Sequence, residues 1–317
     1  MILFRYPANS VASLNGYFTG RYFRTAEGLP RLLCWSSTTN RICPTIARMD
    51  QEEGRRRRIA AVTGASGAIG MAIARQLAAA PGHEVVLICR DQAKAARCVD
   101  TISRATGNPH VRYELTDLSR RASIHALAQR WKGPLDVLVN NAAVAPRRRM
   151  QTPEGIEMQF ATNVLGYFWV IDALTEHLGQ GSTARIINVA SYWAGGLDLG
   201  DLEFKKRRYN NDAAYRQSKQ ADRMLSVAFA GRLQPLGIRV NACHSGDVNS
   251  TLSNNLGFGG HQSADAGATT PVWLAVSEAG GQHTGRYFEN QREVACPFAR
   301  DTEAVEALYA ACQSYSA

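Results

Sequence analysis

Tyr215 and Lys219, in the stretch AAYRQSKQA over residues 213–221, have the residue types and the spacing for proton-transfer chemistry. On a helix, side chains four residues apart lie on one face, with Cβ atoms about 5–6 Å apart. A lysine ammonium at that distance favours the tyrosinate and lowers the tyrosine pKa from about 10. The pair therefore predicts a group that exchanges a proton with a carbonyl or an alcohol near neutral pH. A solvated pair of side chains on a helix surface is the alternative.

A glycine-rich turn, TGASGAIG over residues 63–70, lies between a predicted strand over 58–64 and a predicted helix over 71–79. Backbone N–H groups at a helix N-terminus can hold a pyrophosphate, and small residues permit its close approach. The turn therefore predicts a dinucleotide site, with a plain tight turn as the alternative. Its candidate cofactor residues are Gly64, Ser66, Gly67, Ala68, Ile69 and Gly70.

These residues must be positioned by the alternation of short apolar strands and helices that begins at residue 58. Further strands are predicted over 83–90, 111–118, 135–143, 184–191, 237–246 and 285–290, and helices over 123–131, over 154–178 and around Tyr215. Such crossover connections imply a parallel sheet covered on both faces. We expect an α/β fold, a single doubly wound Rossmann-type domain with about seven strands, whose ligands bind at the carboxyl ends of the strands.

Arg90 stands at the end of the second predicted strand, where the 2′ position of a bound dinucleotide is expected. A guanidinium suits the 2′-phosphate of NADP, whereas a carboxylate accepts from the 2′-hydroxyl of NAD. Asp91 follows directly and competes for the role, and a solvated strand-end charge is the plain alternative. Because the strand delivers Arg90 first to the sheet edge, we expect NADP (NADPH) to be preferred, with NAD possible.

The net charge of +9 is concentrated at the N-terminal end of the chain. Residues 1–58 carry ten arginines and four acidic residues, and the remaining 26 basic and 23 acidic residues contribute only +3. This balance argues against a nucleic-acid partner for the folded domain. The sequence has no apolar run long enough for a membrane span. The seven scattered cysteines indicate a reducing compartment and neither disulfides nor a metal site.

Residues 1–48 are rich in Arg and Ser and poor in acidic residues, as organellar transit peptides are. We interpret them as a leader, either a targeting segment or a disordered stretch before a start at Met49, with the domain over 49–317. The expected location is intracellular: cytoplasmic, or a mitochondrion or plastid if the leader is a transit peptide.

The glycine turn, NNAA over 140–143, Ser191 and the Tyr215/Lys219 pair, in that order, resemble the short-chain dehydrogenase/reductase family over about residues 57–290. The segment TPEGIEMQFATNVLGYF and the long interval from Ser191 to Tyr215 resemble the branch of retinol dehydrogenases, WW-domain oxidoreductases and protochlorophyllide reductases. The resemblance implies an NADP(H)-dependent oxidoreductase that interconverts a carbonyl and a primary or secondary alcohol.

The resemblance also implies roles for individual residues. Tyr215 would be the general acid/base, and Lys219 would lower its pKa and hold the nicotinamide ribose. Ser191 would bind the substrate carbonyl, and Asn163 would help to hold a relay water. Further cofactor contacts would come from Asp117, Leu118, Asn141, Ala142, Gly246 and Val248. Taken singly, Ser191, Asn163 and Asp117 also fit plain structural roles, as a turn cap, a helix-interior polar residue and an N-cap.

Three residues depart from the family pattern: Ala68 and Ala143 replace glycine, and Ser245 replaces proline. Each alanine adds a methyl group near the expected cofactor path. A nucleotide-sugar epimerase or dehydratase with tightly held NAD remains an alternative, as does a catalytically idle NADPH-binding sensor. The substrate is a small molecule of unknown identity, and a homo-oligomer is possible. Arg147, Arg148 and Arg149 form a solvated loop or, pointing inward, would favour an acidic substrate.

Overall fold

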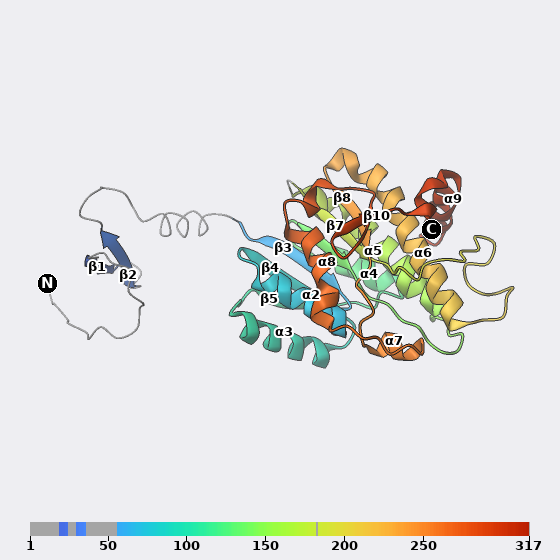
Figure 1. Cartoon of the computed structure of the whole chain (residues 1–317), viewed down its shortest axis with the longest axis horizontal. Coiled ribbons are helices and arrows are strands. Elements are labelled where there is room, and N and C mark those ends of the chain that lie inside the picture. Colours follow the sequence, from blue (N-terminus) through green and yellow to red (C-terminus); the bar gives the residue numbers. More distant parts are fainter. Residues whose placement is uncertain (1–18, 25–29, 36–55, 182, 317) are drawn as a thin grey trace. The chain divides into compact units, whose positions relative to one another are not determined.

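The computed structural model describes residues 19–24, 30–35, 56–181 and 183–316 (Figure 1). The chain divides into two units, Met1–Arg56 and Arg57–Ala317. In the first unit, β1 (Thr19–Arg24) pairs antiparallel with β2 (Pro30–Trp35). The other residues of the predicted leader, and the predicted domain start at residue 49, lie outside the described residues.

The second unit is built on an eight-stranded sheet in the order β10-β9-β8-β7-β6-β3-β4-β5. Its strands are β3 (Arg58–Thr63), β4 (His83–Cys89), β5 (Val111–Leu115), β6 (Val137–Asn140), β7 (Arg185–Val189), β8 (Arg239–Cys243), β9 (Tyr287–Glu289) and β10 (Arg292–Val294). Strands β3 to β9 pair in parallel, which confirms the doubly wound Rossmann-type fold. The additional strand β10 pairs antiparallel with β9 across Asn290 and Gln291, whose φ angles of 49° and 61° suit a tight hairpin turn.

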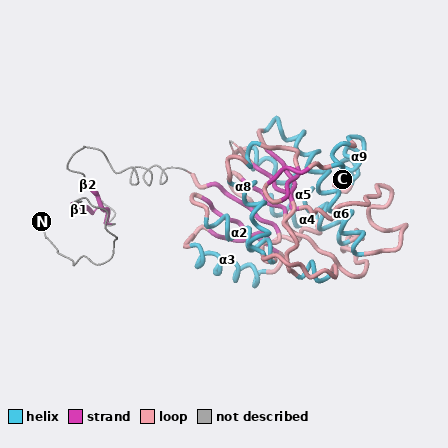
Figure 2. The backbone as a smooth tube through the Cα atoms, in the orientation of Figure 1, coloured by secondary structure: helices cyan, strands magenta, loops and turns pink. Residues whose placement is uncertain are grey.

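Helices cover both faces of this sheet (Figure 2). One hydrophobic cluster joins the sheet to α2 (Ala68–Ala79), α3 (Gln92–Thr106) and α8 (Ala264–Val276). A second cluster joins the other face to α4 (Arg121–Arg130), α5 (Gly166–Gly179), α6 (Asn211–Leu233) and α9 (Thr302–Ser314). The shorter elements are η1 (Phe160–Leu165), η2 (Gln234–Leu236), α7 (Thr251–Asn255), η3 (Gly280–Gln282) and η4 (Pro297–Arg300).

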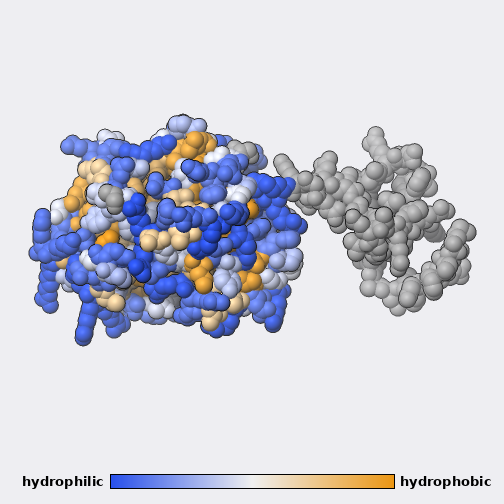
Figure 3. Space-filling view, turned by 180° about the vertical axis from the view of Figure 1, so that it is seen from behind, coloured by the Kyte–Doolittle hydropathy of each residue, from blue (hydrophilic) through white to orange (hydrophobic). Residues whose placement is uncertain are grey.

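The central strands are buried on both sides, as their continuous apolar sequences predict. All four residues of β6 and the last four of β3 are buried. On the face of the molecule seen in Figure 3, apolar residues lie in small groups among hydrophilic ones. No helix within the described residues is long and apolar enough to cross a membrane.

Several predicted boundaries are wrong, for example by two or three residues for the strands predicted over 135–143 (β6) and 237–246 (β8). Local hydrogen bonds explain two further errors. The predicted strand 111–118 ends at Leu115, because the side chain of Asp117 accepts from the amide of Ser119 at 3.0 Å and turns the chain. The predicted helix 154–178 begins later, because Gly155, at φ 84°, forms a turn in which its amide donates to Thr152 O at 2.9 Å. The helical part then divides into the π-helical η1 and the regular α5.

Candidate active site

Helix α6 brings Tyr215 and Lys219 together beside the carboxyl ends of the central strands. The side chain of Asn210 caps the helix and accepts from the amide of Ala213 at 2.8 Å. Tyr215 and Lys219 are both buried. Lys219 Nζ lies 5.9 Å from the centroid of the Tyr215 ring. The two side chains therefore share one helix face, as their four-residue spacing predicts.

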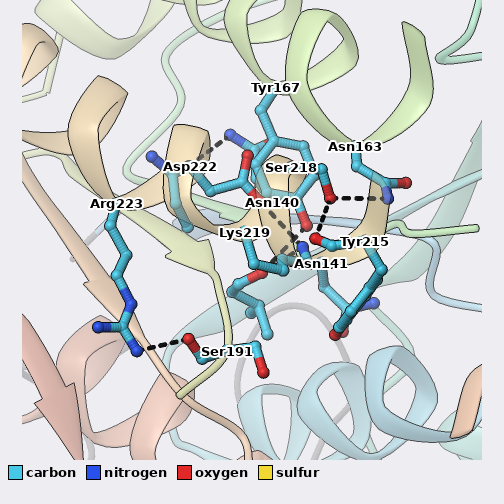
Figure 4. Close-up of polar contacts among 12 residues, drawn as sticks. Asn140, Asn141, Asn163, Tyr167, Ser191, Tyr215, Ser218, Lys219, Asp222 and Arg223 are labelled. Carbon is cyan, nitrogen blue, oxygen red and sulfur yellow. Dashed lines mark hydrogen bonds and ion pairs between the residues drawn. The ribbon is translucent and has the colours of Figure 1, made fainter. Parts of the chain in front are cut away.

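Ser191, two residues beyond the end of β7, completes a converging set with this pair (Figure 4). Its side chain lies near that of Tyr215 and helps to lower the pKa of the phenol. Its hydroxyl oxygen accepts from the amide of Trp193 at 3.1 Å. Ser191, Tyr215 and Lys219 line a cavity of about 240 Å³. A hydroxyl and a phenol that face one cavity can hold and protonate a carbonyl oxygen.

The electrostatics of Tyr215 differ in part from the expectation. Burial raises the pKa of Tyr215, while the charge of Lys219 and the side chain of Ser191 lower it. The carboxylates of Asp222 and Asp247 raise it again. Lys219 thus acts in the predicted direction, but the net pKa lies above its ordinary value because desolvation and two nearby carboxylates outweigh the ammonium.

Asn163 is fully buried in η1, where it connects two parts of the site. Its Oδ1 accepts from the amide of Val144 at 2.8 Å, and its Nδ2 donates to Val144 O at 3.0 Å and to Ser218 Oγ at 3.2 Å. The Ser218 hydroxyl donates to Tyr215 O at 2.8 Å. Asn163 therefore fixes the loop after β6 to the helix that carries Tyr215.

The glycine turn forms part of a second cavity, of about 490 Å³. Gly64 has φ +64°, and a Cβ atom there would lie 2.8 Å from Ala142 Cα; at Gly70 it would lie 2.4 Å from Gly64 O. These two glycines thus permit close backbone packing. Gly67 is exposed at the N-terminus of α2 and has no side-chain cap, so the first amides of the helix are open to an anion.

The two cavities share wall residues, including Ile69 and Asn141, and adjoin each other in a cleft along one edge of the sheet. Its length and its open helix N-terminus fit a dinucleotide with its pyrophosphate at Gly67. Ala68 and Ala143, the two departures from the family pattern, both lie in the cleft wall.

Arg90 is exposed directly after β4 and lines the same cleft, as does Lys94 from the first turn of α3. Asp91 has a different task. Its carboxylate caps α3 and accepts from the amide of Lys94 at 2.9 Å. The acidic competitor for a ribose contact is therefore engaged in the helix cap, whereas two cations face the cleft.

Asp117, Leu118, Asn141 and Ala142 line the cleft from the loops after β5 and β6. Thr63, at the end of β3, positions the last two. Its hydroxyl oxygen accepts from the amides of Asn141 at 2.8 Å and Ala142 at 3.1 Å, and its carbonyl accepts from Asn141 Nδ2 at 3.0 Å. Thr63 was not among the predicted site residues, although its place as the first residue of the glycine turn was a usable signal.

Gly246 and Val248 line the smaller cavity where the chain leaves β8. Gly246 has φ +80°, a backbone conformation that favours glycine. The segment from Ser250 to Leu252 opens α7 and borders both cavities. Phe258 follows and its ring meets the Trp193 ring edge-on, with centroids 5.4 Å apart. This loop covers the part of the cleft that adjoins Ser191.

Every residue of the predicted site except Asn163 lines one of the two cavities. None of Arg147, Arg148 and Arg149 does, and Arg149 Nε donates to Glu203 O at 3.1 Å. The sequence analysis missed further polar residues in or behind the site: Lys94, Asp222, Arg223, His244 and Asp247. Among the described residues, no group of His, Cys, Asp and Glu is placed to hold a metal ion.

Comparison with known proteins gives a consistent result. The model of the short chain dehydrogenase family matches residues 58–257. Retinol dehydrogenase 13 of Mus musculus is 36% identical over 271 residues, covering 78% of this chain and 80% of that protein. Retinol dehydrogenase 12 of Mus musculus is 32% identical over 267 residues, covering 80% and 84%.

Among solved structures, a protein from Escherichia coli CFT073 that is described as a short chain dehydrogenase, in complex with NADPH, has a similar fold. It superposes with a TM-score of 0.61 at 23% identity and covers 76% of this chain and 99% of that chain.

Proposed function

The chain belongs to the short-chain dehydrogenase family, in its retinol dehydrogenase-like branch, and from this premise we propose that it is an NADPH-dependent carbonyl reductase with Tyr215 as proton donor. That it is an oxidoreductase of carbonyl and alcohol groups follows from the family. The choice of NADPH and the role of Tyr215 are our proposal. One observation carries it: Ser191, Tyr215 and Lys219 line a cavity that shares wall residues with the cavity below the open amides of α2.

In this mechanism NADPH supplies the hydride that adds to the carbonyl carbon. The Ser191 hydroxyl holds the carbonyl oxygen next to the Tyr215 phenol. Tyr215 gives its proton to that oxygen as the alcohol forms, and the ammonium of Lys219 stabilises the resulting tyrosinate. In the reverse direction, the tyrosinate takes the proton from the alcohol. Asn163 supports the geometry by fixing the 144 loop to α6, and its proposed contact with a relay water adds to that role.

The preference for NADPH is supported by the different positions of the charged residues at the start of α3. Arg90 and Lys94 place two positive charges on the cleft wall, and Asp91 is engaged as the cap of α3. A guanidinium and an ammonium together suit a 2′-phosphate, which carries about two negative charges. The remaining predicted contacts, from Asp117 and Leu118 to the adenine and from Gly246 and Val248 to the carboxamide, belong to the same proposal.

The substrate side of the cleft is mostly apolar. Tyr192, Trp193, Leu252 and Phe258 contribute its apolar walls, His244, Asp247 and His261 also line it, and the three arginines over 147–149 do not. An uncharged carbonyl compound with an apolar body therefore suits the cavity better than an acidic substrate. The retinol dehydrogenases among the relatives make an apolar aldehyde of that kind a first choice for testing.

The test is a panel of apolar aldehydes, ketones and carboxylated analogues with NADPH, followed through the absorbance of the reduced nicotinamide. We expect turnover with uncharged members and little with the carboxylated ones. Turnover only with carboxylated compounds would contradict the substrate proposal. A nicotinamide that co-purifies and does not exchange would instead favour an epimerase-type enzyme.

The leader over 1–48 is proposed to serve targeting and not catalysis. The cavity-lining residues all lie between Gly64 and His261, so the proposed chemistry requires none of the leader. A fluorescent protein fused behind residues 1–48 should leave the cytosol, and uniform cytosolic fluorescence would contradict the targeting role.

A further inference from the structure

Behind the proposed catalytic pair lies an ion pair that the mechanism above does not use. Lys219 Nζ and Asp222 Oδ2 are 2.9 Å apart on α6, and their side chains are 2% and 0% exposed (Figure 4). Charged side chains are almost never buried this completely unless they are paired. The ammonium that faces Tyr215 thus has a carboxylate as its immediate neighbour.

The ammonium has other close neighbours. Lys219 Nζ donates to Val189 O at 2.9 Å and lies 5.1 Å from the centroid of the Tyr167 ring. An ammonium has three hydrogens, and Val189 O and Asp222 Oδ2 engage two of them. The position of the Lys219 head group is therefore set by these partners.

Asp222 is less well satisfied. Its Oδ2 is paired with Lys219, but its Oδ1 has no hydrogen-bond partner among the described residues. Burial raises the pKa of Asp222, and the Lys219 ammonium lowers it, with a net increase. For Lys219, burial lowers the pKa, but the charges of Asp222 and the nearby phenols outweigh it and raise the pKa. The charge of each group thus shifts the pKa of the other.

The titratable groups that face Asp222 come from several elements. Lys219 and Tyr215 share α6 with it, Tyr167 faces it from α5, and Cys312 faces it from α9. Burial raises the pKa of the Cys312 thiol, as it does that of Cys243 on β8, next to Lys219. Lys219 and Asp222 are therefore the groups of this set that carry charge, and the carboxylate of Asp222, when ionised, offsets the ammonium of Lys219 next to Tyr215.

A buried ion pair costs desolvation energy and is by itself weak support for the stability of a fold. Because this ion pair lies next to the proposed proton donor, it affects the ionisation of Tyr215. A positive charge alone would favour the tyrosinate, but a carboxylate at hydrogen-bond distance from that charge cancels much of its field at Tyr215.

We propose that Asp222 is a positioning residue for Lys219 that, while ionised, opposes the tyrosinate form of Tyr215 and so sets the pH above which alcohol oxidation proceeds. This inference rests on the proposed function, because it requires Tyr215 to carry the transferred proton. Asp222 acts only through Lys219 and Tyr215 and touches no reactant.

The test is the pH dependence of kcat/KM for alcohol oxidation with NADP+, in the wild type and in Asp222→Asn. The amide has nearly the same shape but no charge, so the tyrosinate forms more easily. A nearby charge shifts a pKa by about 1–3 units, and we expect the rise of the oxidation profile to move down by at least about one pH unit. A merely structural role would lower the rate without moving the profile.

Asp172→Asn is the matched control, because Asp172 is exposed on α5 and its loss should leave the profile in place. An Asp222→Asn profile that is unchanged or shifted to higher pH would overturn the proposal. If Tyr215→Phe loses turnover but Asp222→Asn leaves the profile in place, this inference alone fails. If Tyr215→Phe retains turnover, the proposed function fails.

If Asp222→Asn does not fold, the role of Asp222 can be tested in the wild type. The tyrosinate absorbance of the cofactor-free wild type, minus that of Tyr215→Phe, reports the ionisation of Tyr215 directly. A midpoint clearly below the ordinary value of about 10 contradicts the role of Asp222, whereas a midpoint above it is required by that role together with the burial of Tyr215.

Discussion

Arg223 donates a hydrogen bond from its guanidinium to the carbonyl oxygen of Ser191, one helical turn beyond Lys219. The guanidinium is buried and lies 3.5 Å from the centroid of the Tyr287 ring on β9. It thus links α6, the end of β7 and β9 directly behind the serine that holds the proposed substrate oxygen. This contact predicts a positioning role for Arg223.

Arg223→Met should lower kcat by roughly tenfold to a hundredfold, because small misplacements of a reacting group have effects of that size. The KM for NADPH should change little, since Arg223 lies away from the nucleotide cleft. Steady-state kinetics with both substrates varied measures this. Arg232→Met, on the exposed part of the same helix, is the control. An unchanged kcat in Arg223→Met would show that Ser191 is held without this contact.

The identity of the cofactor is tested by Arg90→Ala. Charge-assisted hydrogen bonds contribute about 1.5–3 kcal/mol, which corresponds to roughly a 10–150-fold loss of NADPH affinity. NADH should be almost unaffected, because it lacks the 2′-phosphate. Arg104→Ala on α3 is the control, since Arg104 is 79% exposed and pairs with Asp100. Equal losses for both cofactors, or a wild type that prefers NADH, would contradict the role of Arg90.

The substrate-side loop after β7 gives a prediction about acid stability. Burial acts to raise the pKa of Asp201, but hydrogen bonds from the amides of Arg207, Lys205 and Lys206 outweigh it and lower the pKa to about 2. The unfolded chain therefore takes up this proton before the folded one does. The stabilisation by Asp201 is fully present above pH 3.8, the ordinary value, and is lost as the pH falls through about 2.

Denaturant unfolding of Asp201→Asn and of the wild type, from neutral pH to about pH 2, measures this contribution. The variant should be less stable at neutral pH and should lose less stability on acidification. Asp100→Asn, at an exposed position on α3, is the control. Parallel curves of unfolding free energy against pH for Asp201→Asn and the wild type would show that Asp201 does not contribute to the acid sensitivity of the fold.

A protein that begins at Met49 should retain the melting temperature and turnover of the full chain. Among the described residues, the two hydrophobic clusters that bury the sheet consist of residues from Ile59 onward. Thermal unfolding and NADPH turnover of the shortened chain measure the prediction. A large loss of either would mean that residues 1–48 contribute to the domain.

The sheet and the catalytic cluster were predictable because their signals are local. Parallel strands buried on both faces require continuous apolar runs, and the carboxyl ends of such strands meet at one edge. Ser191, Tyr215 and the glycine turn therefore had to lie near one another once the strand order was known. The strand β10 was missed because three exposed residues carry no apolar pattern.

Asp222 and Arg223 were missed for a tertiary reason. Two adjacent charged residues within a helix normally indicate a solvent-facing side. Here α9 and β9 pack over that side of α6 and bury both. Their spacing of three and four residues from Lys219 places them next to it on the helix. This spacing predicts a buried contact only when the elements that cover the helix are known.

The most direct test of the proposed chemistry is the turnover of Tyr215→Phe with NADPH and an accepted carbonyl compound, measured together with NADPH affinity. The substitution retains the ring and removes only the proton donor. We expect the Kd for NADPH to remain near that of the wild type and kcat to fall by about 10²–10⁴-fold, the usual contribution of a general acid. A Tyr215→Phe enzyme that binds NADPH normally and keeps most of its turnover would contradict the assignment of Tyr215 as the proton donor.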